Sequence, residues 1–313
     1  MFKCLTAPCS TILVFLNWSL KQKIEFLYDE FGVSRYHNSG IKGSSVKIVV
    51  VDTGSESTAK SSWGGTLRTP KHGLAVSSIL TGVENHFQGI APEAQVEVVD
   101  LQTSKQIPIS AVLKAIEEAV DRGTDILSIS LGTADSWGPM QSLIDKAVSK
   151  NILVFAAAGN SGDRGYEYPS ACVGAISVAS INQARQPSAF NTRNDATVVF
   201  APGEQLSLPL GNGELAEFSG TSFATPFAAG LAALVLSKAR KEGKKFIARR
   251  EMIDILRSED HLGLNCTTHT YVMEPTCTEI KSSLIQTEPS YNSAGSLFLI
   301  ALLLVAAYYI SKL

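Results

Sequence analysis

Short, continuous apolar stretches recur along the middle of the chain. They cover residues 46–51, 95–99, 125–131, 152–158, 175–179 and 197–200. Strands of this kind are apolar on both faces, which is typical of the interior of a parallel sheet. Helical stretches separate them at residues 72–80, 109–122 and 140–150. This alternation predicts an α/β fold: a doubly wound, mostly parallel sheet with helices on both faces.

A long buried helix is expected after Gly220. Residues 228–236 are apolar nearly all round, and a helix with that pattern has no face for solvent. Pro226 fits the first helical turn, where its missing N–H leaves no bond unmade. Ser222 then lies at the start of the helix, where free N–H groups and the helix dipole favour an anion. Taken alone, however, Ser222 is more simply explained as a helix N-cap.

The two ends of the chain differ from the middle. Residues 294–310 are uncharged and apolar, which predicts a single transmembrane helix near the short limit for a span. A polar linker is expected at residues 258–293, before this helix. Removal of the tail for a lipid anchor, and a peroxisomal address in the last three residues, are weaker interpretations. Residues 1–24 resemble a signal peptide without a clean cleavage site, so export stays open.

Composition narrows the class of protein. The chain has 313 residues, 45% of them hydrophobic and 18% charged, with a formal net charge of -2. These values suit one well-cored domain, expected at residues 25–257, with terminal extensions. The near-neutral charge favours no nucleic-acid partner. We expect a monomer that the predicted helix ties to a membrane, with an extracytoplasmic domain if the chain is exported.

The cysteines indicate neither a disulfide framework nor a zinc site, because they are few and scattered. They are Cys4, Cys9, Cys172, Cys266 and Cys277. Cys266 and Cys277 are close enough to pair in an oxidising compartment, and Asn265 begins a glycosylation-type sequon. Both signals are weak because such short patterns recur by chance.

Four polar residues fall where the predicted elements begin or end. Asp52 and Asn160 follow predicted strands, whereas His72 and Ser222 begin predicted helices. In open α/β sheets, ligands bind beyond the carboxyl ends of the strands. A nucleophilic serine needs a base, the base needs an orienting carboxylate, and the resulting anion needs hydrogen-bond donors. Each residue alone is a weak signal, but the order Asp, His, Ser is specific.

Short motifs around these residues extend over most of the chain. They are Val49-Val-Val-Asp52-Thr-Gly54, His72-Gly73, Gly89-Ile-Ala-Pro92, Ser128-Ile-Ser-Leu-Gly132, Ala156-Ala-Ala-Gly-Asn160, Tyr168-Pro169, Ala201-Pro-Gly203 and Gly220-Thr-Ser-Phe-Ala-Thr-Pro226. With these motifs, residues 31–257 resemble the subtilisin-like serine proteases, or subtilases. The resemblance implies a serine endopeptidase in which Ser222 attacks the peptide carbonyl, His72 transfers the proton and Asp52 orients His72. The side chain of Asn160 and the backbone N–H of Ser222 would bind the oxyanion.

The same resemblance implies where a polypeptide substrate binds. An extended peptide would add as a strand along three consecutive residues, Ser130, Leu131 and Gly132. Small residues would line the P1 pocket and leave room for a large side chain: Ala156, Ala157 and Gly159. Glu167 aligns near the pocket floor and would favour Lys or Arg at P1. A solvent-facing loop glutamate is an equally good interpretation of Glu167.

Departures from the family pattern bear on cofactors. The spacing between Asp52 and His72 is shorter than usual, so the carboxylates that often bind calcium there are missing. Glu84 and Asn85 could supply oxygen ligands, but a structural calcium site has no support beyond these two residues. We expect catalysis to need no cofactor.

Two other function classes remain for comparison. A subtilase-like module that binds peptides without cutting them is the main alternative, and the full set of four reacting residues argues against it. An α/β-hydrolase esterase is disfavoured because Ser222 lacks the Gly-x-Ser-x-Gly context and because the order is Asp, His, Ser.

Overall fold

The computed structural model describes residues 27–54, 72–101, 107–135, 138–210, 213–258 and 264. The predicted signal-like segment at residues 1–24, nearly all of the predicted linker and the predicted membrane span at residues 294–310 lie outside the described residues. The expectations about these segments therefore stay predictions.

Strands and helices alternate along the described residues, as the apolar pattern predicts. The strands are β1 (Lys47–Asp52), β2 (Gly82–Val83), β3 (Phe87–Gln88), β4 (Gln95–Asp100), β5 (Ile126–Ile129), β6 (Leu153–Ala157), β7 (Ile176–Ile181), β8 (Thr197–Pro202), β9 (Leu206–Pro209) and β10 (Leu215–Phe218). The helices are α2 (Val33–Asn38), α3 (His72–Thr81), α4 (Ile109–Asp121), α5 (Gly138–Ser149), α6 (Thr221–Lys241) and α7 (Arg249–Arg257).

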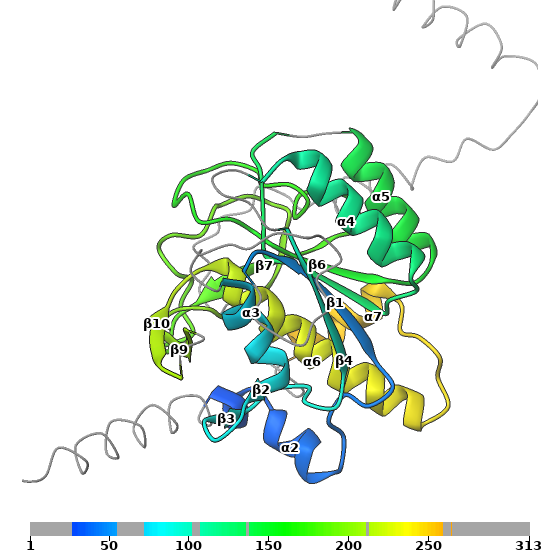
Figure 1. The fold of residues 1–313 in the computed structure, drawn as a ribbon, viewed down its shortest axis with the longest axis vertical. Helices are drawn as coiled ribbons and strands as arrows, with labels where there is room; N and C mark the ends of the chain where they lie inside the picture. Colours follow the sequence, from blue (N-terminus) through cyan, green and yellow to red (C-terminus); the bar gives the residue numbers. More distant parts are fainter. Residues whose placement is uncertain are drawn as a thin grey trace, which may run out of the picture. The chain divides into compact units, whose positions relative to one another are not determined.

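One parallel sheet forms the centre of the fold, with the strand order β4-β1-β5-β6-β7-β8 (Figure 1). The chain runs from β1 to β4 on one side and then crosses to β5 on the other. Strand order thus reverses at β1, and in open α/β sheets ligands bind beyond the carboxyl ends of the strands at such a point. Asp52 ends β1 and Ser130 directly follows β5, so both lie where a ligand is expected.

Helices cover both faces of this sheet, which explains why its strands are continuously apolar. On β1, Ile48 and Val50 belong to a core shared with α3 and α6, whereas Val49 and Val51 belong to a core shared with α4 and α5. Figure 1 shows these two helix pairs on opposite sides of the strands. The sequence-based prediction of a mostly parallel sheet with helices on both faces is confirmed.

Two antiparallel hairpins were not predicted. β2 pairs with β3, and β9 pairs with β10. Their strands are short, and β2 and β10 are only partly buried or exposed along their length, so they carry no continuous apolar run that periodicity could detect.

Helix α6 is buried on nearly every side. It begins at Thr221, five residues before Pro226, so the prediction that Pro226 lies in the first turn is wrong. Within the described residues, α6 is the one helix long and apolar enough to cross a membrane, and 89% of its most apolar window is buried in the domain. A core helix passes the same test, so α6 gives only weak support for a membrane span.

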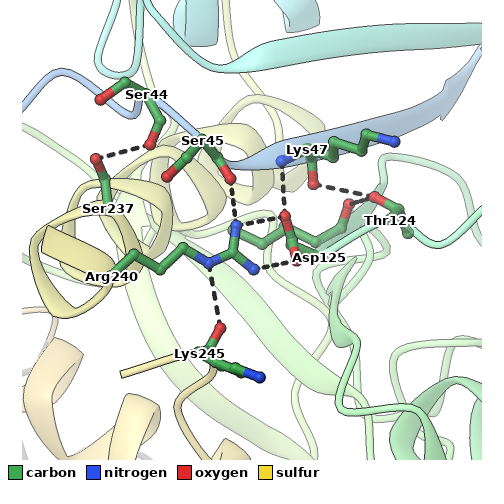
Figure 2. Close-up of polar contacts among 9 residues, drawn as sticks. Ser44, Ser45, Lys47, Thr124, Asp125, Ser237, Arg240 and Lys245 are labelled. Carbon is green, nitrogen blue, oxygen red and sulfur yellow. Dashed lines mark hydrogen bonds and ion pairs between the residues drawn. The ribbon is translucent and has the colours of Figure 1, made fainter. Parts of the chain in front are cut away.

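Arg240, near the C-terminal end of α6, binds residues at the amino ends of the central strands β1 and β5 (Figure 2). Its guanidinium binds both carboxylate oxygens of Asp125, which directly precedes β5. It also donates to the backbone carbonyls of Ser45 and Lys245. Asp125 in turn accepts the N–H of Lys47, at the start of β1, at 2.8 Å. Helix α6 therefore connects the amino ends of the strands with the site at their carboxyl ends.

Candidate active site

Asp52 and His72 form a direct hydrogen bond. Asp52 is the last residue of β1, and its side chain is completely buried, at 0% exposure. Its Oδ1 accepts from His72 Nδ1 at 2.6 Å and from the backbone N–H of Thr53 at 2.6 Å. Its Oδ2 is buried without a hydrogen-bond partner among the described residues. Because Nδ1 donates to the carboxylate, neutral His72 keeps its lone pair on Nε2.

Burial and charge act in opposite directions on this pair. Burial is the largest influence on the pKa of Asp52 and raises it, while the hydrogen bond and charge of His72 lower it. Burial is also the largest single influence on the pKa of His72 and lowers it, but the hydrogen bond and the charge of Asp52 together outweigh burial. The pKa of His72 is therefore raised above its ordinary value of 6.5.

A turn directly after Asp52 holds the amino end of α3. The carbonyls of Thr53 and Gly54 accept the N–H groups of Gly73 at 2.6 Å and of Leu74 at 3.3 Å. These N–H groups belong to the first turn of the helix and have no acceptor within it. A Cβ at residue 73 would lie 2.9 Å from the Thr53 carbonyl oxygen, so this close approach requires glycine.

Ser130 and Ser222 bind each other's backbone carbonyl. The Ser130 hydroxyl donates to the Ser222 carbonyl at 2.7 Å, and the Ser222 hydroxyl donates to the Ser130 carbonyl at 3.2 Å. Pro226 has no N–H, so the carbonyl four residues earlier, that of Ser222, lacks its helical donor. Ser130 supplies the missing donor. A proline inside α6 is thus accommodated by a residue from the end of β5.

The side-chain amide of Asn160 is held in one orientation. Its Oδ1 accepts the backbone N–H of Thr221 at 2.9 Å and the Thr221 hydroxyl at 3.0 Å. With Oδ1 fixed on the start of α6, the N–H donors of the amide are left for another acceptor. Asn160 is exposed, so those donors are accessible to a ligand beside Ser222.

The His72 ring packs against the ring of Phe223, the residue that follows Ser222. The centroids of the His72 and Phe223 rings are 5.2 Å apart, and Phe218 packs on Phe223 at 5.3 Å. In the described part of the chain, Ser222 Oγ donates to Ser130 and not to His72. Catalytic hydrogen bonds are often open in a ligand-free site and form when the substrate binds.

A pocket of about 330 Å³ lies between the ends of β5 and β6 and the start of α6. It is lined by Ser130, Leu131, Gly132, Ala157, Gly159, Asn160, Ser161, Glu167, Thr221 and Ser222. The structure therefore brings together all but one of the residues expected to bind substrate. Ala156 is the exception, because its side chain is fully buried in the core shared with α4 and α5.

Ser161 and Thr221 line the pocket although sequence reasoning did not select them. Thr221 carries the hydroxyl that holds Asn160, and Ser161 N–H donates to Thr192 Oγ1 at 3.1 Å. Both directly follow or precede residues that were selected, Asn160 and Ser222. Adjacency to those residues is the signal that could have identified them.

Glu167 forms one wall of this pocket. A Cβ at residue 132 would lie 2.7 Å from Glu167 Oε2, and one at residue 159 would lie 2.4 Å from Glu167 Cγ. The Glu167 side chain therefore occupies space that only Gly132 and Gly159 leave open. Burial raises the pKa of Glu167. Backbone hydrogen bonds between Thr133 and Tyr168, at 2.8 and 3.0 Å, hold this wall against the strand end.

We searched the described residues for side chains that could bind a metal ion and for a reactive cysteine thiol. Among them, no group of three or more His, Cys, Asp or Glu side chains is placed to hold a metal ion. Cys172 is a free, buried cysteine, and burial raises the pKa of its thiol to about 11. The thiolate that would make Cys172 a nucleophile is therefore scarce near neutral pH.

Comparisons with known proteins agree with this geometry. Residues 43–260 match a family model described as the subtilase family. Subtilisin from Bacillus pumilus is 32% identical over 238 residues, 69% of this chain and 86% of that protein. Subtilisin E from Bacillus subtilis (strain 168) is also 32% identical over 238 residues, and the chain spans only 62% of that protein's length.

Two solved structures are similar in fold and sequence. The prenylagaramide maturation protease PagA superposes with a TM-score of 0.66 and 26% identity, covering 72% of this chain and 88% of that one. The self-cleaved protease domain of PatA gives a TM-score of 0.63 and 25% identity, covering 72% of this chain and 95% of that one.

Proposed function

The chain belongs to the subtilase family of serine endopeptidases, and we propose that Asp52, His72 and Ser222 form its catalytic triad. The observation that carries the proposal is the 2.6 Å hydrogen bond between His72 and the fully buried Asp52. A buried carboxylate that is hydrogen-bonded to an imidazole fixes the tautomer of the imidazole and stabilises the imidazolium that forms during the reaction.

The first half of the reaction acylates the enzyme. A turn about the Ser222 Cα–Cβ bond moves Oγ from the Ser130 carbonyl toward His72 Nε2. Oγ then attacks the peptide carbonyl while Nε2 takes its proton, and the carbonyl oxygen becomes an oxyanion. His72 returns this proton to the leaving amine as the C–N bond breaks, so an acyl-enzyme and a free amine remain.

The oxyanion is bound by Asn160 and by the first turn of α6. Asn160 Oδ1 is occupied by Thr221, which leaves Nδ2 to donate. The backbone N–H of Ser222 lies where helix N–H groups have no internal acceptor. Two donors fixed before the reaction stabilise the negative charge without reorganising.

The second half of the reaction releases the acid product. Water replaces the amine, His72 takes its proton, and hydroxide attacks the acyl carbonyl while the same donors hold the oxyanion. The collapse of this intermediate returns the proton to Ser222 Oγ and frees the carboxylic acid. No cofactor enters either half of the reaction.

Substrate binding is proposed at the end of β5. An extended peptide would add as a strand along Ser130, Leu131 and Gly132, with its P1 side chain in the pocket beside Ala157 and Gly159. In the described part of the chain the Glu167 carboxylate has no cationic partner. We therefore infer a preference for Lys or Arg at P1, because an unpaired, partly buried carboxylate is stabilised by a cation.

Membrane tethering rests on the sequence of residues 294–310 alone. Protease protection of isolated membranes, with a tag near Asn265, tests both the tether and the side on which the domain lies. Protection or glycosylation of the tagged protein would support an extracytoplasmic domain, and cleavage of the tag from the cytosolic side would exclude it.

The triad is tested by labelling with a fluorophosphonate and by peptide turnover. We expect wild-type protein to be labelled at Ser222 and to cleave unstructured polypeptides. Ser222→Ala should lose the label and, as in subtilisin, about 10⁶-fold in kcat. Wild-type-like turnover by folded Ser222→Ala protein would exclude the mechanism, and a folded wild type with neither label nor turnover would favour the non-cutting peptide-binding module. A P1 library that shows purely aromatic or aliphatic preference would exclude the role of Glu167.

A further inference from the structure

A second buried acid lies beside Asp52. Strands β1 and β4 run parallel, and Asp52 and Asp100 are register partners at their carboxyl ends. Asp100 is only 3% exposed. Two carboxyl groups on adjacent strands are therefore enclosed at the same edge of the sheet. No motif or spacing in the sequence singled out Asp100.

The charge of Asp100 acts on Asp52. Burial, and to a smaller extent the charge of Asp100, raise the pKa of Asp52. An apolar residue like Val98 and Val99, which precede Asp100 on the same strand, would not add this charge. A second acid placed beside Asp52 therefore indicates a role other than stability.

One contact of Asp100 is with the turn after Asp52. Asp100 Oδ1 accepts the N–H of Gly54 at 2.9 Å. That N–H and the Thr53 carbonyl belong to one peptide group, and the carbonyl accepts the N–H of Gly73 at 2.6 Å. One peptide plane is thus held from both sides, by a carboxylate at its N–H and by a helix at its carbonyl. Hydrogen bonds linked in this way strengthen each other.

The helix held by this peptide group begins with His72. Gly54 adopts a left-handed φ of 68°, so the plane of the turn is set by a conformation that glycine tolerates. The Gly54 carbonyl accepts the N–H of Leu74 at 3.3 Å. A tilt of the Thr53–Gly54 peptide would therefore move the amino end of α3, and with it the imidazole relative to Asp52.

We propose that Asp100 is a positioning residue for peptide hydrolysis, because it fixes the peptide group that sets His72 against Asp52. The inference rests on the proposed triad. It assigns to Asp100 no contact with substrate. The effect on His72 depends on Asp100 Oδ1 as a hydrogen-bond acceptor for Gly54 N–H, and not on the charge of Asp100.

The test compares two substitutions of similar shape. Asp100→Asn keeps an oxygen acceptor for Gly54 and loses the charge, whereas Asp100→Leu loses both. We expect Asp100→Leu to lower kcat about 10- to 100-fold with KM changed less than about twofold, since small misplacements of a reacting group cost up to about 10²-fold. Asp100→Asn should keep kcat within about threefold of wild type. Kinetics are measured on a peptide substrate, with fluorophosphonate labelling rates beside them.

Val99→Ala is the matched control for stability. It removes buried apolar atoms from the same strand, but on the face that packs in the core shared with α4 and α5 rather than with α3, so it should lower the melting temperature and leave kcat unchanged. If Asp100→Leu yields no folded protein, Asp100→Ala serves the same comparison, because it also lacks the acceptor.

The outcomes separate this inference from the triad itself. Wild-type turnover that depends on Ser222, together with unchanged kcat in folded Asp100→Leu, would refute the role of Asp100 alone. Equal losses in Asp100→Asn and Asp100→Leu would also refute it, since the acceptor would then not matter. Wild-type protein without Ser222-dependent turnover would refute the triad and, with it, this inference.

Discussion

The Ser130 hydroxyl donates to the Ser222 carbonyl at 2.7 Å, in the place where a helix N–H would donate if residue 226 were not proline. Pro226 removes one bond from α6 beside the proposed nucleophile, and the end of β5 restores it. The first turn of α6 is thereby bonded to the sheet rather than only to the rest of the helix.

Ser130→Ala should weaken this attachment. The Ser222 carbonyl would lose its donor in a half-buried site, at a cost of about 1–3 kcal/mol in the free energy of unfolding. We also expect the rate of fluorophosphonate labelling to fall about tenfold as Ser222 becomes less well placed. Ser237→Ala is the control, since that hydroxyl bonds the Ser44 carbonyl at 3.0 Å near the other end of α6. It should lower stability without slowing the label, and an unchanged labelling rate in Ser130→Ala would contradict the prediction.

The pH dependence of kcat/KM should report on His72. The proposed reaction needs neutral His72, so activity should rise as pH increases through the pKa of His72, which lies above its ordinary value because of Asp52. Asp52→Asn removes the carboxylate that stabilises the protonated imidazole. The pKa of His72 then falls, and the acid limb of the profile should move to lower pH while kcat drops by about 10⁴, as in subtilisin. Profiles from about pH 5 to pH 10 test this, and an acid limb that stays in place or moves upward would contradict it.

Asn160→Ala should lower kcat and leave KM nearly unchanged. In the proposed mechanism its amide donor acts on charge that develops during the reaction, and loss of the corresponding asparagine donor in subtilisin costs about 10²–10³ in kcat. Thr221→Val, which removes one of the two groups that orient the amide, should cause a smaller loss of the same kind. Steady-state kinetics on both variants measure the split, and a rise in KM at constant kcat would assign Asn160 to substrate binding instead.

Arg240→Met should destabilise the protein without changing its kinetics. The guanidinium makes charge-assisted bonds to Asp125 and two carbonyls while still partly exposed, so we expect a loss of about 1.5–3 kcal/mol. That corresponds to a fall in melting temperature of about 3–12 °C for a domain of this size. Lys238→Met is the control on the same helix, because its exposed pair with Glu242 at 3.7 Å should contribute almost nothing. Equal melting temperatures for the two variants would contradict the prediction.

The central sheet was predictable because strands that are buried on both faces consist of consecutive apolar residues, which can be recognised in the sequence. β1 and β6 read as continuous apolar runs, and their short length favours a strand over a buried helix such as α6. The Asp, His, Ser order was readable for a related reason, since each residue sits at the boundary of such a run. The start of α6 after Gly220 was predicted correctly, but the place of Pro226 within the helix was not. The usual preference of proline for the first turn is overridden here by a tertiary contact from Ser130.

Relations across the sheet were not predictable. Asp100 meets the turn after Asp52 only because β4 and β1 pair in one particular register, and no local pattern encodes that register. The same limit applies to Ala156, which neighbours Ala157 in sequence but faces the opposite side of β6. Side chains alternate along a strand, so Ala156 and Ala157, which are adjacent within β6, point to opposite faces of the sheet.

The path of α6 through the core also affects how the enzyme loses its activity when it is heated. One buried helix carries the proposed nucleophile at its start and the Arg240 clamp at its end, so a molecule that opens its core gives up its activity as a whole. Its backbone then becomes an extended chain of the kind the remaining folded copies cut. Thermal inactivation should therefore be irreversible and should proceed faster at higher enzyme concentration. The residual activity should be proportional to the fraction of molecules that are still folded.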